Sequence, residues 1–141
     1  MLYGPPYVSL EWVLSFYGMI PERVQTITGM TTGKNKEYRT SVGTFSYQHL
    51  APNRHSVGIT QKKADDFFGH FLMASPEKAL ADWVFITSRH LDKKQLQQDL
   101  LESKRIDRDT LQHLNKSLLS QIAASCRSKS VGYSIDIIGT L

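Results

Sequence analysis

Cysteine is nearly absent from this chain: Cys126 is the only one in 141 residues. A lone cysteine cannot form an intramolecular disulfide, so a packed core must hold the fold, and a cytoplasmic location is expected. No stretch approaches the ~18 consecutive apolar residues of a transmembrane helix, so neither a membrane span nor a membrane partner is expected. Residues 1–6 have no basic region and no long apolar core, so we do not expect a signal peptide.

The common phosphate-binding and nucleophile motifs are also missing. Neither G-x-G-x-x-G, G-x-x-x-x-G-K-[ST] nor G-x-S-x-G occurs. The five histidines are not paired at the spacing of helical metal ligands, so no metal and no cofactor are expected. The residue chemistry therefore favours a binding domain over an enzyme.

Acidic residues are scarce between residues 24 and 63, where Glu37 is the only one. With six cations the segment carries +5, although the whole chain is only +4. Aromatic residues lie among the cations, and such a mixture can bind nucleic acid by neutralising phosphates and stacking on bases. The alternative is a solvated sheet face with the aromatic residues on its buried side. The candidate nucleic-acid-binding residues are Lys34, Lys36, Arg39, Arg54, Lys62 and Lys63.

Hydrophobic spacing predicts an α+β fold, with a small mixed or antiparallel sheet from the first half packed against helices of the second half. A short helix is expected over residues 9–18, with Ser9 as its N-cap and Gly18 at its end. Gly69 is a candidate β-bulge. Short β-type runs predict strands near residues 24–28, 38–42, 44–50, 57–60 and 67–74.

The second half is helical in pattern. Ser-Pro-Glu at residues 75–77 is a strong helix start, with a capping hydroxyl followed by proline at the first helical position. A second helix is expected from Asp92, and a third from Asp107 or Asp109 through Ile122. Residues 130–141 are expected to form a β-type or frayed tail.

Two alternatives to nucleic-acid binding follow from the same residues. Apolar side chains at Leu111, Leu114, Leu118 and Ile122 would suit a protein-interaction or oligomerisation module, although such a stripe is more simply core. The second, more remote alternative is a metal-dependent nuclease that uses the carboxylates of Asp65, Asp66 or Glu77 with Lys62 or Lys63. Because adjacent strand residues point to opposite sides, a solvated turn explains residues 65–66 better.

Three motifs in order resemble the AbiEi family of antitoxins. Residues 4–11, GPPYVSLE, and 15–22, SFYGMIPE, are similar to the family's G-P-x-Y-[IV]-S-L and [LI]-I-P-E segments. Thr31-Thr32 and residues 42–50, VGTFSYQHL, are similar to T-T and L-G-x-F-x-Y-x-x-[IL]; residues 74–82, ASPEKALAD, are similar to A-[TS]-P-E-K-A-L-x-D. The resemblance covers about residues 3–125. Its residues, expected to be structural, are Gly4, Pro5, Tyr7, Ser9, Gly18, Pro21, Gly43, Phe45, Tyr47, Pro76, Glu77, Lys78 and Asp82.

The resemblance implies the antitoxin half of a bacterial type IV toxin–antitoxin, or abortive-infection, pair that confers phage resistance. The cognate toxin of such a pair resembles a nucleotidyltransferase. Family members carry an N-terminal winged helix that binds their own promoter, followed by an α+β domain needed for antitoxin activity. Residues 1–141 are expected to be a single α+β domain that resembles this C-terminal part, with the winged helix supplied separately. The resemblance brings no catalytic residues; weak DNA binding would use the cations of residues 24–63.

Overall fold

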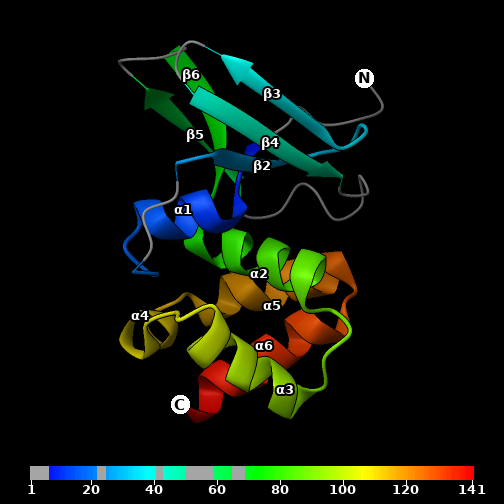
Figure 1. Ribbon diagram of the computed structural model, residues 1–141. Coiled ribbons are helices and arrows are strands. Elements are labelled where there is room, and N and C mark those ends of the chain that lie inside the picture. Colours follow the sequence, from blue (N-terminus) through cyan, green and yellow to red (C-terminus); the bar gives the residue numbers. More distant parts are fainter. Residues whose placement is uncertain (1–6, 22–24, 41–42, 50–58, 65–68) are drawn as a thin grey trace.

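The computed structural model describes residues 7–21, 25–40, 43–49, 59–64 and 69–141 (Figure 1). The expected α+β fold is confirmed: the first half contributes a mixed six-stranded sheet, and most of the helices come from the second half. The strands are β1 (Tyr7–Val8), β2 (Ile27–Thr31), β3 (Lys36–Thr40), β4 (Gly43–His49), β5 (Ile59–Ala64) and β6 (Gly69–Ala74). The helices are α1 (Leu10–Phe16), α2 (Pro76–Thr87), α3 (Lys93–Gln98), the π-helical turn η2 (Asp99–Ser103), α4 (Arg108–Gln112), α5 (Lys116–Cys126) and α6 (Lys129–Thr140).

The strand order is β3-β4-β2-β1-β6-β5. Two antiparallel pairs, β3/β4 and β5/β6, form the two edges of the sheet, and β1 and β2 form its centre. The contacts between centre and edges, β2 with β4 and β1 with β6, are parallel. In Figure 1 the sheet lies at the top, α1 and α2 lie beneath it, and α3 to α6 form the lower part of the molecule.

Both faces of the central strands are buried. The strand register places Val8, Ile27 and Phe45 on one face, and Tyr7 and Met30 on the other. All five belong to one hydrophobic core, which continues through α2 into the lower helices. Helix α2 is therefore central, because its buried residues contact the sheet side as well as α5 and α6. None of the helices in the described part of the chain is long and apolar enough to cross a membrane.

The predicted start of α2 is confirmed. The Ser75 hydroxyl accepts a hydrogen bond from the backbone N–H of Lys78 at 3.1 Å, and Pro76 opens the helix. The predicted end of the first helix is also confirmed, since Gly18 follows α1 with φ of +72°. Glycine is the residue that adopts this left-handed conformation without steric cost.

Ser9 is the N-cap residue of α1, as expected, but its side chain makes no cap hydrogen bond. Thr28 of β2 takes that role, because its hydroxyl oxygen accepts from the backbone N–H of Trp12 at 3.2 Å. The Thr28 hydroxyl also donates to the carbonyl oxygen of Ser9 at 2.7 Å. The hydroxyl of Ser9 is thus available for a different partner, described below.

Three other expectations need correction. Gly69 pairs with Ala64 in an uninterrupted register, so it is not a bulge. The helix expected through residue 122 is two helices, because the chain breaks after α4 and Asn115 caps α5 by accepting from the backbone N–H of Leu118 at 3.0 Å. The expected β-type tail is α6, whose buried face includes Val131 and Ile138. Packing against α2, α3 and α5 favours a helix there despite two glycines and four β-branched apolar residues.

Candidate functional site

Residues from two of the three sequence motifs meet where β1 contacts α2. Asp82 of α2 is at the centre: its Oδ2 atom accepts hydrogen bonds from the Tyr7 hydroxyl at 2.8 Å and from the Ser9 hydroxyl at 2.7 Å. Its Oδ1 atom lies 3.1 Å from the Nζ atom of Lys78, one helical turn away. The Lys78 ammonium also lies 5.8 Å from the centre of the Tyr7 ring. We call Tyr7, Ser9, Lys78 and Asp82 the anchor network.

Burial dominates the electrostatics of the anchor network. The side chains of Lys78 and Asp82 are 1% and 3% exposed. Burial raises the pKa of Asp82, while Lys78 and the hydroxyls of Ser9 and Tyr7 oppose that rise by stabilising the carboxylate. Burial, followed by the nearby charge of Asp82, raises the pKa of Tyr7 well above its usual value. The phenol therefore acts as a hydrogen-bond donor at neutral pH.

This geometry suits a structural role. The carboxylate of Asp82 collects three donors, and none of the four side chains faces solvent. A substrate cannot reach a group buried in this way, whereas loss of one partner of the pair would leave an uncompensated buried charge between α2 and β1. Helix α2 is thus capped at Ser75 and joined to β1 through Asp82.

The remaining motif, which includes residues 42–50, lies mainly on β4. Tyr47 of β4 packs against Gly29 of β2, where an added Cβ would lie 2.7 Å from the Tyr47 ring and 2.4 Å from the carbonyl oxygen of Tyr7. Gly29 therefore lets β1 and the Tyr47 ring approach each other. Phe45 is buried in the core, and Gly43 opens β4 with φ of +145°, a conformation that side chains rarely adopt. Gly4 and Pro5 lie outside the described residues.

The remaining motif residues lie around the ends of α1 and α2. Pro21 is exposed after α1. Glu77 is buried in the first turn of α2, and its Oε2 atom accepts from the backbone N–H of Asn115 at 3.0 Å. Glu77 thus joins α2 to the break between α4 and α5. In the part of the chain that the structure describes, no group of three or more His, Cys, Asp or Glu is placed to hold a metal ion.

Three of the six candidate cations lie at one edge of the sheet. Lys34 is in the loop between β2 and β3, and Lys36 and Arg39 are on β3; all three are exposed. Lys36 lies opposite Tyr47 and Arg39 lies opposite Thr44, so their side chains project from opposite faces of the sheet. Lys34 and Lys36 are two residues apart in the chain, and Arg39 projects from the face opposite to that of Lys36.

The other three cations are not brought to β3. The backbone of Lys62 and Lys63 lies in β5, which forms the opposite edge of the sheet. Arg54, like Asp65 and Asp66 of the nuclease alternative, is outside the described residues. The described part of the basic surface is thus the edge formed by β3 and the preceding loop.

His49 lies in the basic segment of the sequence but was not among the candidate binding residues, and the structure places it at this edge. The Nδ1 atom of His49 lies 2.8 Å from the carbonyl oxygen of Gly33, and its backbone N–H donates to Oδ1 of Asn35 at 2.6 Å. Both contacts hold the loop that carries Lys34 against the end of β4. His49 alternates with Tyr47, so it shares the face of Lys36. The spacing of residues 45, 47 and 49 was the available signal. We call Lys34, Lys36 and His49 the basic edge.

A second buried ionic cluster lies in the lower helices and was also missed. The Lys104 ammonium lies 2.6 Å from Oδ2 of Asp99 and 2.8 Å from the Ser88 hydroxyl, and 4.9 Å from the centre of the Trp83 ring. The Ser88 hydroxyl donates to the same Asp99 oxygen at 2.6 Å. Lys104 and Ser88 are both buried, so this cluster holds the π-helical turn η2 against the end of α2.

Comparison with protein-family models, with curated proteins and with solved structures found no match to this chain.

Proposed function

We propose that this chain is a non-catalytic regulatory domain of the antitoxin type, which contacts DNA and opposes a nucleotidyltransferase-like toxin in an abortive-infection system. The main support for this proposal is that three AbiEi-like motifs occur in the same order as in that family. The anchor network supports it, because Tyr7, Ser9, Lys78 and Asp82 of two motifs have one shared role in joining β1 to α2.

DNA contact is proposed at the basic edge. Lys34 and Lys36 are exposed cations close together in the chain, with the ring of His49 fixed beside their loop. Each phosphate that a cation neutralises releases counterions, so binding should weaken steeply with salt. Such contacts carry no base recognition, and a winged helix supplied separately would provide operator specificity.

The DNA proposal is tested by a gel shift of the chain on its upstream DNA across a salt series. Reversing two charges with Lys34→Glu and Lys36→Glu should weaken binding at least tenfold and reduce the salt slope by roughly 1.8, since each lost phosphate contact removes about 0.9. The control reverses two exposed cations of the helical part, Lys94 and Lys116, which changes net charge equally. Equal loss in both variants would mean that net charge alone drives binding and that the basic edge is not the contact.

The toxin proposal needs a separate measurement. Co-expression of the chain with its proposed nucleotidyltransferase-like toxin should restore growth that the toxin alone arrests. Asp82→Ala should abolish this rescue if the folded domain is required, whereas the Lys34→Glu, Lys36→Glu variant should retain it. Continued growth arrest in the presence of the soluble wild-type chain would contradict the antitoxin proposal.

A protein-interaction module without DNA binding is the second candidate. One observation favours it: Phe16 of α1 is 59% exposed, stacks on Trp12 at a ring distance of 5.4 Å, and meets the edge of Tyr17 at 5.2 Å. Exposed aromatic rings of this kind are enriched at protein interfaces. Light scattering across a concentration series should show an oligomer that Phe16→Ser dissociates; a monomer at every concentration would exclude self-association.

A further inference from the structure

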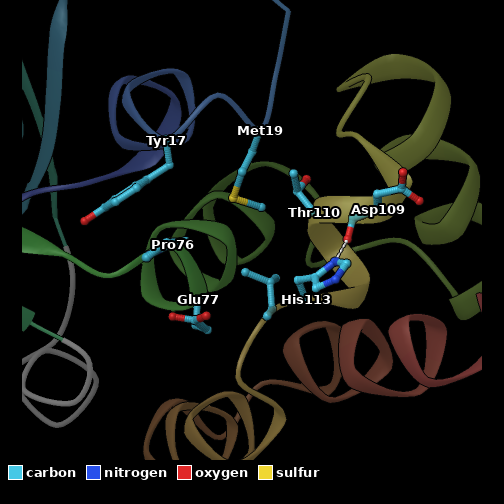
Figure 2. A pocket seen from close by; sticks show the side chains of 8 residues that line it. Tyr17, Met19, Pro76, Glu77, Asp109, Thr110 and His113 are labelled. Carbon is cyan, nitrogen blue, oxygen red and sulfur yellow. Dashed lines mark hydrogen bonds between the residues drawn. The ribbon is translucent and has the colours of Figure 1, made fainter.

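A pocket of about 320 Å³ lies between the end of α1, the start of α2 and helix α4. Its walls include the apolar side chains of Met19 and Leu114 and the ring of Tyr17. Polar groups come from Glu77, Asp109 and His113 (Figure 2). The elements that form it belong to the helical side of the molecule, away from β3 in Figure 1.

Glu77 gives this pocket an unused acceptor. The residue is only 8% exposed, so it is a nearly buried carboxylate. Its Oε2 atom accepts the backbone N–H of Asn115 at 3.0 Å. The Oε1 atom receives no hydrogen bond from any other residue that the structure describes. Because Glu77 lines the pocket, its carboxylate is the acceptor that the pocket offers to a donor on a ligand.

His113 adds a second acceptor. Its Nδ1 atom lies 2.6 Å from the carbonyl oxygen of Asp109. A carbonyl oxygen only accepts, so Nδ1 carries the hydrogen, and in the neutral ring Nε2 is an acceptor. Figure 2 shows the ring of His113 held in this way beside Asp109. The hydrogen bond fixes the ring orientation before any ligand arrives.

The charge of the pocket is opposite to that of the chain. Two acids and no Lys or Arg line it, whereas the whole protein is +4. Its polar groups thus include two oriented acceptors with negative charge beside them, and its apolar walls suit a hydrocarbon stem. A guanidinium suits such a lining better than an ammonium, because it presents five N–H donors in a planar fork to acceptors and has a flat face that stacks on aromatic rings.

We propose that this pocket binds a guanidinium group on an alkyl stem, donated either by an arginine side chain of a partner protein or by a small free guanidine. The guanidinium donates to Oε1 of Glu77, and the stem packs on Met19 and Leu114. This inference is independent of DNA binding, since it uses none of the basic-edge residues.

The test is an NMR titration of the full ¹⁵N-labelled chain with acetyl-arginine-methylamide. The neutral isostere acetyl-citrulline-methylamide is the matched control ligand. The backbone amide of Asn115 is the reporter, because it donates to Glu77. Glu77→Gln keeps a carbonyl oxygen for Asn115 and replaces the free oxygen with an N–H₂ donor. Glu102→Gln removes an exposed acid elsewhere and is the control variant.

We expect saturable shifts at Asn115 with the arginine probe, at least tenfold weaker binding of the citrulline probe, and at least tenfold weaker arginine binding in Glu77→Gln but not in Glu102→Gln. Agmatine, which lacks the peptide groups, separates the two sources. Tighter binding of the arginine probe supports a protein side chain, and equal or tighter binding of agmatine supports a free guanidine. Equal binding of arginine and citrulline probes, or no saturable shift in the wild-type chain, overturns the proposal without requiring any variant to fold.

Discussion

Removal of the Asp82 carboxylate should lower the free energy of unfolding of this domain by a large fraction. Asp82→Ala deletes the acceptor of the Tyr7 and Ser9 hydroxyls. It also removes the carboxylate that lies 3.1 Å from the ammonium of Lys78, whose side chain is 1% exposed. Breaking a buried pair by removing one partner costs about 3–5 kcal/mol. That is a large share of the roughly 5–15 kcal/mol that stabilises a typical domain.

The chain offers a matched control in the pair Lys93–Asp136. Its Nζ–Oδ2 distance is 2.9 Å, similar to the 3.1 Å of Lys78–Asp82, but its side chains are 51% and 59% exposed. Exposed pairs contribute about 0–1 kcal/mol. Asp136→Ala should therefore cost less than about 1 kcal/mol. The two ion pairs have similar lengths but differ strongly in burial and in the donors around the carboxylate.

Urea unfolding followed by circular dichroism measures both variants. With a slope of about 2 kcal/mol per molar, the midpoint of Asp82→Ala should fall by about 1.5–2.5 M and that of Asp136→Ala by less than about 0.5 M. Asp82→Asn is the milder variant to use if alanine prevents folding. Equal midpoints for Asp82→Ala and Asp136→Ala would refute the anchor role of the network.

Three further predictions address single contacts. Because burial raises the pKa of Asp82, the folded state holds the carboxyl proton more tightly than the unfolded state does. The stability of the wild-type chain relative to Asp82→Asn should therefore fall as the pH rises from the ordinary aspartate range through the raised pKa. Urea unfolding at several pH values measures this difference. Gly29→Ala should lower the free energy of unfolding by about 1–3 kcal/mol, because its Cβ would lie 2.4 Å from the carbonyl oxygen of Tyr7. Gly33→Ala, whose Cβ would have its nearest atom at 3.6 Å, should lower it much less. Thermal melts of both variants test this difference. Asn115→Ala removes the N-cap of α5 and should lower the free energy of unfolding, measured with urea, by about 1 kcal/mol. An unchanged midpoint would mean that this cap does not stabilise the domain.

Local chemistry predicted the elements whose ends depend on neighbouring residues. Ser75 and Pro76 marked the start of α2, because a hydroxyl cap and a fixed φ act within one turn. Asp92 marked α3 in the same way, and the structure adds a full capping box with Gln95. The strands on either side of Gly43, β3 and β4, followed from short β-type runs in the sequence. These features require no knowledge of distant contacts.

Distant contacts decided the features that were wrong. Residues 129–140 include glycines and β-branched residues, which favour a strand or a frayed end in isolation, yet they form α6 because Val131 and Ile138 pack on other helices. The apolar spacing from residue 111 to 122 continues across the break between α4 and α5. At that break the backbone N–H of Asn115 donates to Glu77, which is 38 residues away in the sequence. Propensity and periodicity carry no information about such a partner.

The sequence alone determined the α+β class, the capped helix start at residues 75–77 and the scarcity of acids around Lys34 and Lys36, since composition and short-range hydrogen bonding are local properties. Only the tertiary structure decided that Asp82 meets Tyr7, that His49 holds the loop of Lys34, and that Lys62 and Lys63 lie on the opposite edge of the sheet from β3. The physical reason is that strand order and helix packing set which side chains share a surface, and the energies that choose among such arrangements come from burial over the whole domain.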